Sequence, residues 1–416
     1  TDAYMHMILH VVRSGKQVIL LIPEISLTYQ TIDRLYSVFG DKIAVIHSKL
    51  TPGERYEQIA KCRDGSADVI IGPRSALFAP FKNIGLIVID EEHDTAYKNE
   101  NVPRYNTIDV VKKRARMHGA SVVLASATPS PESFRYAMDG SYTLLKLTER
   151  ATGAALPNIE VIDMREEMQA GNRSIFSVRL DELIHDRLAK REQIILFMNR
   201  RGYSNFLSCR SCGNAVRCPH CDVSLTVHLN THQLVCHYCG HTIPLPSVCP
   251  ECGGEMKMHG FGTERIEEEV HKLFPEARVM RMDLDTTRRK DDYQTIIDSF
   301  ARHEVDILIG TQMVTKGLHF DDVSLVAVLN ADQIVAQPDF RSTERAYQLL
   351  EQVAGRAGRK GTEGQVYIQS FDPKNEVYEF VKNHDYTGLY ANEIKERKTF
   401  KYPPFYRLIE VTLRHS

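Results

Sequence analysis

Eight of the nine cysteines stand in four Cys-x-x-Cys pairs within one short stretch of the chain. The pairs are Cys209/Cys212, Cys218/Cys221, Cys236/Cys239 and Cys249/Cys252. Each pair can offer two thiolates to one metal ion, and two pairs complete the tetrahedral, all-thiolate shell of a structural zinc site. Because such a shell leaves no open position for water, the pattern predicts two structural Zn²⁺ ions with no catalytic role.

The spacing of the pairs favours a nested arrangement. Fourteen residues separate Cys221 from Cys236, which is close to the hairpin length of a zinc ribbon. The two inner pairs would then hold one ion and the two outer pairs the other. Tandem pairing is the alternative, and it needs a tight five-residue connection between Cys212 and Cys218. An iron–sulfur cluster or disulfides would use the same thiols, and Cys62 stands alone, with no role expected.

A second group of side chains suits nucleotide chemistry. An apolar run, residues 87–89, leads directly into Asp90-Glu91-Glu92-His93. An acidic cluster at the carboxyl end of a parallel strand lies where such sheets bind ligands. In nucleotide hydrolysis an Asp at this place holds Mg²⁺, and the next Glu orients and deprotonates the attacking water. A solvated acidic turn is the simple alternative for this string alone.

Two further motifs support the nucleotide interpretation. Ser126-Ala127-Thr128-Pro129 follows another apolar run, and small hydroxyl residues at a strand end can sense the acidic cluster. Residues 352–359 end a helical stretch, with Arg356 and Arg359 three apart on one helical face. A guanidinium there can stabilise charge on a transferring phosphate. Alone this string is a charged helix end, but the three motifs in this order favour a nucleotide hydrolase.

The apolar runs around these motifs predict two parallel sheets. Short β-branched runs read as buried strands at 18–22, 43–46, 69–71, 86–89 and 122–125, and again at 159–162, 194–197, 279–282, 305–309, 325–329 and 366–369. Helical patterns lie between them, such as 109–118, and this alternation is typical of a parallel sheet covered on both faces. The cysteine block interrupts the second series between two of its strands.

The composition is that of a globular protein and excludes several other classes. Hydrophobic residues make up 43% and charged residues 25% of the 416 residues, which excludes disorder and collagen-like repeats. No apolar run reaches the roughly 18 residues of a membrane span, and no signal peptide is visible. The net charge of −2 shows no basic excess, so nucleic-acid binding would have to come from local patches.

Taken together, the motifs resemble those of superfamily 2 helicases. Asp90-Glu91-Glu92-His93, Ser126-Ala127-Thr128 and residues 352–359 resemble motifs II, III and VI. Further resemblances are to motif Ia at 21–28, to the next DNA-contact motif at 72–77, to motif IV at 197–203 and to motif V at 310–317. With the zinc block included, the chain resembles the PriA family of bacterial replication-restart helicases over nearly its whole length.

The resemblance implies an α/β fold of two RecA-like parallel-sheet lobes, with a small insertion in the second lobe that holds two four-cysteine zinc sites. The expected division is a first lobe at 1–150, the start of a second lobe at 151–207, a zinc-binding insertion at 208–254, the rest of the second lobe at 255–372, and a linker with the start of a C-terminal domain at 373–416.

The resemblance also implies roles at the nucleotide. Asp90 would hold Mg²⁺, Glu91 would be the general base, Arg356 and Arg359 would act across the lobes, and Gln352 would contact phosphate or water. No Gly-x-x-x-x-Gly-Lys-Ser/Thr loop occurs in the sequence, and Thr1 resembles the Thr that ends such a loop. We therefore expect a fragment that lacks the loop and the family's N-terminal domains, and that by itself hydrolyses ATP poorly.

Residues after the acidic cluster are candidates for DNA contact. Tyr97, Lys98, Arg104 and Tyr105 interleave aromatic rings with positive charge, a combination that holds single strands by stacking and phosphate pairing. This segment resembles the family's aromatic-rich loop, although Ile108 stands where the family has an Arg, and an ordinary surface loop is the alternative. Further candidates for strand contact are Arg74, Arg200, Arg201 and Lys316.

The resemblance implies an ATP-dependent 3′–5′ DNA helicase that unwinds stalled or abandoned replication forks and restarts replication by primosome assembly. Its expected partners are single-stranded and forked DNA, the single-stranded DNA-binding protein and helicase-loading proteins. A monomer in the bacterial cytoplasm, associated with the nucleoid and not with a membrane, is expected. The alternatives are a superfamily 2 helicase acting on RNA, and a zinc-bearing DNA-binding scaffold that has lost its motor.

Overall fold

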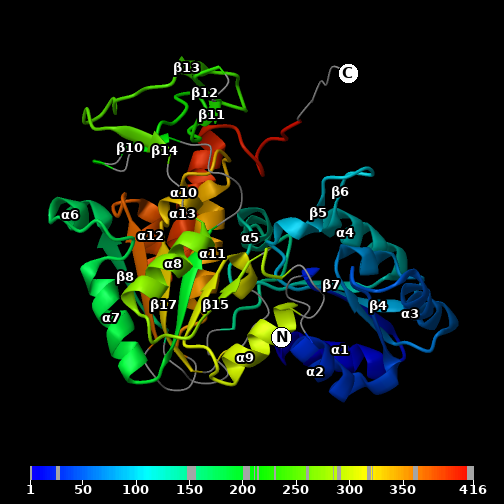
Figure 1. The fold of residues 1–416 in the computed structure, drawn as a ribbon. Helices are drawn as coiled ribbons and strands as arrows, with labels where there is room; N and C mark the ends of the chain where they lie inside the picture. Colours follow the sequence, from blue (N-terminus) through cyan, green and yellow to red (C-terminus); the bar gives the residue numbers. More distant parts are fainter. Residues whose placement is uncertain are drawn as a thin grey trace. The chain divides into compact units, whose positions relative to one another are not determined.

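The computed structural model describes residues 2–24, 29–147, 156–199, 207–209, 211–212, 215–228, 231–258, 262–283, 285–287, 292–315, 320, 322–358 and 364–409. The chain divides into two compact units, with the boundary between Phe134 and Arg135. Each unit is described by itself below (Figure 1).

The first unit is built on a five-stranded parallel sheet in the order β2-β3-β1-β4-β7. The strands are β1 (Gln17–Leu21), β2 (Ile43–Val45), β3 (Val69–Gly72), β4 (Ile84–Ile89) and β7 (Ser121–Leu124). Each coincides with a predicted apolar run to within one residue at either end, except that β4 starts two residues earlier than predicted. The predicted parallel α/β sheet is therefore confirmed for this unit.

Helices cover both faces of this sheet. They are α1 (Asp2–Arg13), α2 (Tyr29–Phe39), α3 (Pro52–Asp64) and α4 (Thr107–His118), with short 3-10 turns η2 (Gly40–Lys42), η3 (Arg74–Phe78) and η4 (Thr95–Tyr97). The helix α5 (Pro131–Met138) spans the boundary between the two units in the chain. Ile19 and Ile87 pack with Val111 of α4 in one apolar cluster, whereas their neighbours Val18 and Val88 pack with Ile8 of α1 in another. Alternate strand residues therefore supply two cores, which explains why the strands read as continuous apolar runs.

The second unit contains a six-stranded parallel sheet in the order β15-β16-β9-β17-β18-β8. Its strands are β8 (Asn158–Asp163), β9 (Gln193–Met198), β15 (Val279–Met282), β16 (Ile307–Gly310), β17 (Val323–Leu329) and β18 (Gln365–Ser370). The predicted second sheet is confirmed. The cysteine block follows β9 in the chain, and the sheet resumes at β15, as expected for an insertion.

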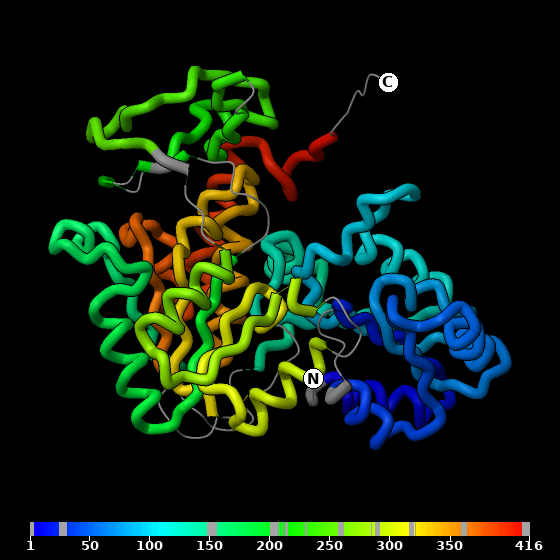
Figure 2. Tube along the Cα trace, viewed as in Figure 1, coloured from blue at the N-terminus to red at the C-terminus, as the bar shows by residue number. Residues whose placement is uncertain are grey.

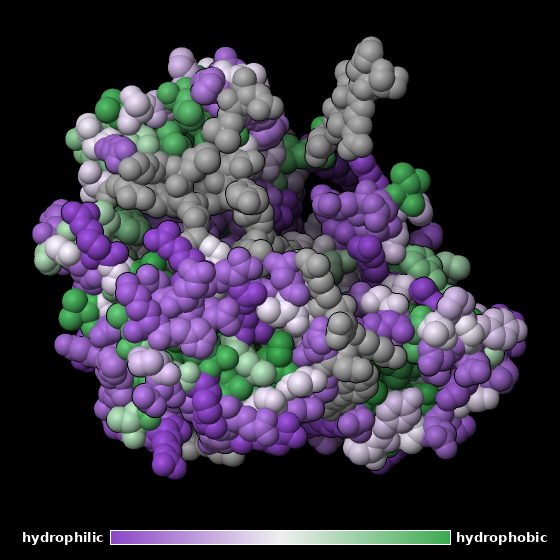
Figure 3. Space-filling view, viewed as in Figure 1, coloured by the Kyte–Doolittle hydropathy of each residue, from purple (hydrophilic) through white to green (hydrophobic). Residues whose placement is uncertain are grey.

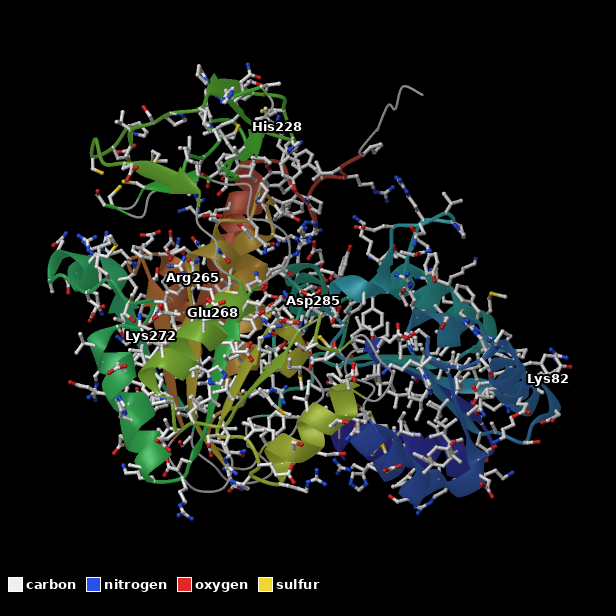
Figure 4. The ribbon with its side chains drawn as sticks, in the orientation of Figure 1. Lys82, His228, Arg265, Glu268, Lys272 and Asp285 are labelled. Atoms are coloured by element: carbon white, nitrogen blue, oxygen red, sulfur yellow. The ribbon has the colours of Figure 1, made fainter. Side chains whose placement is uncertain are left out.

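The helices of this unit are amphipathic where they cover the sheet. They are α6 (Met164–Gln169), α7 (Val178–Ala189), α8 (Thr263–Leu273), α9 (Asp292–Ala301), α10 (Asp332–Val335), α11 (Ser342–Ala354), α12 (Glu376–Lys382) and α13 (Tyr386–Thr399), with the 3-10 turn η5 (Gln312–Val314). In α8, Ile266 and Val270 are buried, while Arg265, Glu268 and Lys272 lie on the outer side in Figure 4, where Figure 3 is hydrophilic. In the part of the chain that the structure describes, no helix combines the length and apolar character needed to cross a membrane.

The cysteine block forms a small module of short antiparallel strands. β10 (Leu207–Cys209) pairs with β14 (Met256–Met258), and β11 (Thr226–His228), β12 (Gln233–Val235) and β13 (Thr242–Pro244) form a three-stranded sheet. Its core combines cysteines with a few apolar side chains, including Leu225 and Leu234. Strands of three residues are too short to show alternation, which is why the sequence predicted none here.

The chain does not leave the second unit near Asp372, contrary to the expectation of a linker there. Instead α12 packs against α11 and β8, and α13 packs against α12 and α11. The buried side of α13 includes Glu393 and Arg397, and the Arg397 guanidinium donates to Glu344 of α11 at 2.6 Å and to Glu393 at 3.0 Å. Since charged residues occupy this buried side, α13 lacks the apolar stripe by which a core-facing helix is predicted.

This buried triad predicts a defined pH dependence of stability. Burial raises the pKa of Glu393 from 4.5 to about 8; the charge of Arg397 opposes this and that of Glu344 adds to it. Between these pH values the folded state holds a proton that the unfolded state releases, so stability falls as pH rises. Glu393→Gln has no such proton. Its free energy of unfolding relative to wild type should therefore rise from pH 4.5 to 8, by at most about 1.4 kcal/mol per pH unit.

Denaturant titrations of both proteins across this pH range provide the measurement. The exposed Glu379 on α12 offers a control, because the free energy of unfolding of Glu379→Gln should differ from that of wild type by the same amount at every pH. A constant difference between Glu393→Gln and wild type would show that Glu393 is ionised in the folded protein.

Candidate functional site

The acidic cluster begins where β4 ends, with β4 lying between β1 and β7. The backbone N–H of Asp90 donates to the Leu21 carbonyl at 2.9 Å, and the Tyr4 hydroxyl donates to Asp90 Oδ2 at 3.0 Å. Burial raises the pKa of the Asp90 carboxyl, and the Tyr4 hydrogen bond opposes this. A half-buried carboxylate at the carboxyl edge of a parallel sheet is suited to a cation, whose charge would favour the ionised form.

Glu91 differs from its neighbours in backbone and in exposure. Its φ of 48° lies in the left-handed region, a conformation that costs a non-glycine residue about 1–3 kcal/mol and that clusters at functional sites. Its side chain is 33% exposed, whereas that of His93 is 5% exposed. The strained turn therefore directs Glu91 toward solvent, as a group that acts on water requires.

The remaining two members of the acidic cluster connect it to the following segment. His93 Nδ1 lies 2.7 Å from Ser126 Oγ, which also accepts from the Thr128 backbone N–H at 3.0 Å. The Glu92 carboxylate is buried and accepts from the Ser130 N–H at 2.6 Å and from the Ser133 hydroxyl at 3.0 Å. His93 is thus the link through which Ser126 can respond to the cluster, a role that the sequence did not predict. Glu92 anchors the start of α5.

The structure separates the four aromatic and basic candidates for DNA contact into two groups. Tyr97 is only 3% exposed, and its hydroxyl lies 2.8 Å from the Asp90 carbonyl and 3.0 Å from that of Leu21. This placement differs from the expected base-stacking role. Tyr97 instead packs beneath the acidic cluster, because its phenol reaches two strand-end carbonyls.

The other three candidates lie toward solvent. Lys98 and Arg104 are exposed, and the Tyr105 ring meets the half-exposed Phe78 ring edge to face at 5.7 Å. They belong to a small hairpin of β5 (Lys98–Asn99) and β6 (Tyr105–Asn106), in whose connecting turn Val102 is 90% exposed. The sequence did not identify Phe78, because its position in η3 is distant along the chain.

Arg74 connects η3 to this hairpin. Its Nη1 donates to the Ala96 carbonyl at 3.0 Å and to the Lys98 carbonyl at 3.2 Å, on either side of Tyr97. A pocket of about 330 Å³ adjoins it, lined by Pro23, Glu24, His47, Ser48, Arg55, Pro73, Arg74, Ser75, Ala96 and Tyr97. Arg74 is therefore engaged with the backbone of the loop.

In the second unit the arginine motif follows a helix rather than continuing it. α11 ends at Ala354, so Gln352 lies in its last turn and Arg356 in the turn beyond. An Arg356 Nη donates to the Thr315 carbonyl, and the Gly358 N–H donates to the Val323 carbonyl at 3.1 Å. Gly358 has a φ of 68°. The expectation that Arg356 lies on a helical face is therefore wrong, because α11 ends before it. The second arginine of that expectation, Arg359, lies outside the described residues, as do Thr1, Arg200, Arg201 and Lys316.

The cysteine sulfurs form two tetrads in the nested arrangement. One contains Cys209, Cys212, Cys249 and Cys252, and the other Cys218, Cys221, Cys236 and Cys239, with all sulfurs of a tetrad within 4.8 Å of one another. Three sulfur pairs lie 3.5 to 3.6 Å apart. Zn–S bonds of about 2.3 Å in a tetrahedron require sulfurs about 3.8 Å apart, so both tetrads fit zinc.

The alternative ligand assignments can now be judged. Tandem pairing is wrong, because each tetrad joins pairs from the two ends of its segment. The eight thiols are free rather than disulfide-bonded. No histidine belongs to either tetrad among the residues described, and His228, labelled in Figure 4, lies with its Nε2 3.2 Å from that of His237. This matches the expectation that four thiolates satisfy each metal.

Three family models match successive parts of the chain. Residues 1–135 match the DEAD/DEAH box helicase model, residues 218–244 the PriA DNA helicase Cys-rich region domain, and residues 261–361 the helicase conserved C-terminal domain. Among relatives, replication restart protein PriA of Bacillus subtilis (strain 168) is 48% identical over 100% of this chain and 52% of its own length. The chain belongs to the PriA family.

Further relatives agree with this assignment. PriA of Synechocystis is 44% identical over 98% of this chain and 50% of its own length, and PriA of Rickettsia felis is 40% identical over 100% of this chain and 64% of its own length. The chain thus spans about half the length of the first two relatives.

Solved structures show the fold. RecG bound to a three-way DNA junction matches with a TM-score of 0.53 at 16% identity, over 95% of this chain and 42% of RecG. The DUF1998 helicase MrfA bound to DNA matches with a TM-score of 0.54 at 14% identity, over 92% of this chain and 44% of MrfA. Both sheets are RecA-like helicase folds, as predicted.

The nested tetrads predict how zinc content responds to substitution. Cys212→Ser and Cys239→Ser should each lower bound zinc from about two ions per chain to about one, because three thiolates hold zinc poorly. Cys212→Ser with Cys249→Ser should still retain one ion, whereas Cys212→Ser with Cys239→Ser should retain none. Metal analysis of the purified variants provides the measurement. Cys62→Ser is the control, and equal zinc loss in the two double variants would contradict two independent tetrads.

Proposed function

We propose that the complete protein containing this chain is an ATP-dependent DNA helicase with 3′–5′ polarity that unwinds stalled or abandoned replication forks and restarts replication by primosome assembly. The observation that carries the proposal is the half-buried carboxylate of Asp90 at the carboxyl edge of a RecA-like sheet, beside the strained and partly exposed Glu91. Similarity to PriA proteins over the whole chain supports a replication-restart helicase among the helicases with this fold.

In the proposed reaction, ATP supplies the phosphoanhydride whose hydrolysis drives movement, and Mg²⁺ supplies charge for the phosphates. Asp90 would hold Mg²⁺, with Tyr4 fixing the rotamer of its carboxylate. Glu91 would orient a water molecule and accept its proton. Gln352, Arg356 and Arg359 stay proposed phosphate contacts, and Thr1 a proposed nucleotide contact.

The contacts of Arg74 and Tyr97 suggest how DNA could influence hydrolysis. Arg74 holds the two carbonyls that flank Tyr97, and the Tyr97 hydroxyl holds the carbonyl of Asp90. A DNA phosphate that drew the Arg74 guanidinium away would release these carbonyls and change the support of Asp90. In this proposal Lys98, Arg104 and Tyr105 contact the strand directly, together with Lys316, while Tyr97 transmits the effect.

The finer features of the proposal follow the family. Single-stranded and forked DNA, the single-stranded DNA-binding protein and helicase-loading proteins are its proposed partners. A monomeric, cytoplasmic and nucleoid-associated protein is proposed, as are the expected limits of the zinc-binding insertion at 207 and 254.

Glu91→Gln should abolish DNA-stimulated ATP hydrolysis in the complete protein, because an amide cannot accept the proton of the attacking water. The loss in kcat should be about 10²-fold or more, a typical contribution of general base catalysis. Steady-state hydrolysis with no DNA, with duplex and with a branched fork provides the measurement. Glu100→Gln, on the exposed hairpin, is the matched control and should retain activity.

If the wild-type protein binds forked DNA but hydrolyses no ATP, the helicase proposal is wrong, and the protein is better explained as a zinc-bearing DNA-binding scaffold. Equal activity of Glu91→Gln and wild type would leave a motor with a different general base.

Tyr97→Phe and Tyr105→Ala should separate coupling from DNA contact. Tyr97→Phe removes only the hydroxyl beneath Asp90, so the maximal DNA-stimulated rate should fall while the DNA concentration for half-maximal stimulation stays constant. Tyr105→Ala removes a partly exposed ring, so that concentration should rise roughly 5- to 160-fold, as expected for a lost stacking contact of about 1–3 kcal/mol. Titration of ATPase activity with single-stranded DNA distinguishes them, and the reverse pattern would exchange the two roles.

A further inference from the structure

The segment that follows α13 returns to the zinc module. The Tyr402 hydroxyl donates to the backbone carbonyl of Cys221, a predicted zinc ligand, at 2.9 Å, although the two residues are 181 positions apart. Tyr402 is 7% exposed, and its N–H donates to the Arg397 carbonyl at 2.8 Å. In Figures 1 and 2 the red segment after α13 accordingly runs beside the green module.

The other tetrad has an equivalent attachment. Arg165, at the start of α6, donates from Nη1 to the backbone carbonyl of Cys212 at 3.3 Å. Its guanidinium is held by Asp163, with Nε to Oδ1 at 2.9 Å and Nη2 to Oδ2 at 2.6 Å. Because this two-point ion pair fixes the guanidinium plane, Arg165 is oriented before it meets the module. Each tetrad thus has one ligand-bearing turn held by a side chain of the second unit.

Aromatic packing extends the Tyr402 attachment to α11. The Tyr402 and Phe340 rings are stacked, with centroids 4.5 Å apart and planes 12° apart, and Tyr238 of the module lies 5.9 Å from Tyr402. The Tyr238 hydroxyl also donates to Asp339 Oδ1 at 3.2 Å. Arg397 lies 5.3 Å from the Phe340 centroid and pairs with Glu344 in the first turn of α11.

The helix α11 connects this cluster to the arginine motif. Its first turn carries Glu344, and Arg356 follows its last residue. Thirteen helical residues form a rod about 20 Å long. Because the helix is rigid and contacts the module at one end and leads to Arg356 at the other, a displacement of either end would move the other end as well.

The strand pair β10–β14 brings the two ends of the module together. A module attached there alone could pivot about one point. Attachments at Cys212 and Cys221 add two separate points, beside the Tyr238–Asp339 hydrogen bond, and three or more points fix a rigid body. We propose that Tyr402 and Arg165 are positioning residues that dock the two zinc tetrads onto the rest of the second unit, so that the module and Arg356 move as one body during unwinding. The consequence for unwinding rests on the proposed function, whereas the docking itself does not.

The test compares Tyr402→Phe, Arg165→Met and the double variant in the complete protein. Tyr402→Phe keeps the stacked ring and removes one hydrogen bond, so the fold should survive. Hydrogen exchange of amides in β11, β12 and β13 and at 340–344 reports docking, and zinc content should stay at wild-type level. Each lost bond is worth about 1 kcal/mol, or roughly fivefold, so the double variant should exchange about 25-fold faster in these segments.

The functional readout is the number of base pairs unwound per ATP hydrolysed. The double variant should lower this ratio about tenfold while its DNA-stimulated ATPase rate stays within about twofold of wild type, because the acidic cluster is untouched. Tyr406→Phe and Arg179→Met, both at exposed side chains, are matched controls and should leave both readouts unchanged.

Unchanged hydrogen exchange in the double variant would overturn the docking. Faster exchange with an unchanged coupling ratio, or a parallel loss of hydrolysis and unwinding, would overturn the positioning role. A wild-type protein that hydrolyses no ATP would refute the proposed function, while the exchange measurement would still decide the docking.

Discussion

The parallel pairing of β4 between β1 and β7 is the constraint on which the candidate site depends. Every residue of β4 except Gly85 is buried, and its neighbours on both sides satisfy its backbone hydrogen bonds. The first residue that can present a charged side chain is therefore the one at which the strand ends, Asp90. The same edge receives Leu21 from β1 and the 126–128 segment after β7, so the sheet brings three distant sequences to one place.

Polar groups buried near this edge organise the surrounding segments. The Tyr4 hydroxyl on α1 donates to the Asp90 carboxylate, and the Tyr97 hydroxyl donates to the Asp90 carbonyl. The His93 ring is hydrogen-bonded to the Ser126 hydroxyl. Buried polar groups are costly unless paired, so each of these contacts restricts the segment that provides it. The acidic cluster is consequently coupled to the hairpin after it and to the segment after β7 through hydrogen bonds rather than through apolar packing.

The zinc module has a different physical basis. It contains few apolar side chains, and its strands are three residues long, so thiolate coordination must supply much of its folding free energy. Its attachment to the second unit uses backbone carbonyls of ligand-bearing turns, which have fixed positions only when the tetrads are formed. Zinc binding and docking are therefore expected to be linked.

The sequence by itself determined the strands of the two parallel sheets, the acidic cluster and the eight zinc ligands, because each depends on residue type and local spacing. The x14 gap also favoured the nested tetrads that the structure contains. Only the tertiary structure decided which aromatic residue is buried and which is partly exposed. Tyr97 and Tyr105 have the same side chain eight positions apart, and only packing distinguishes them. The return of α13 was equally hidden, because its buried Glu393 and Arg397 are matched by Glu344 on a distant helix. A local sequence pattern predicts burial only where the buried residues are apolar. A buried charge whose partner lies far away in the chain cannot be recognised from the residues around it.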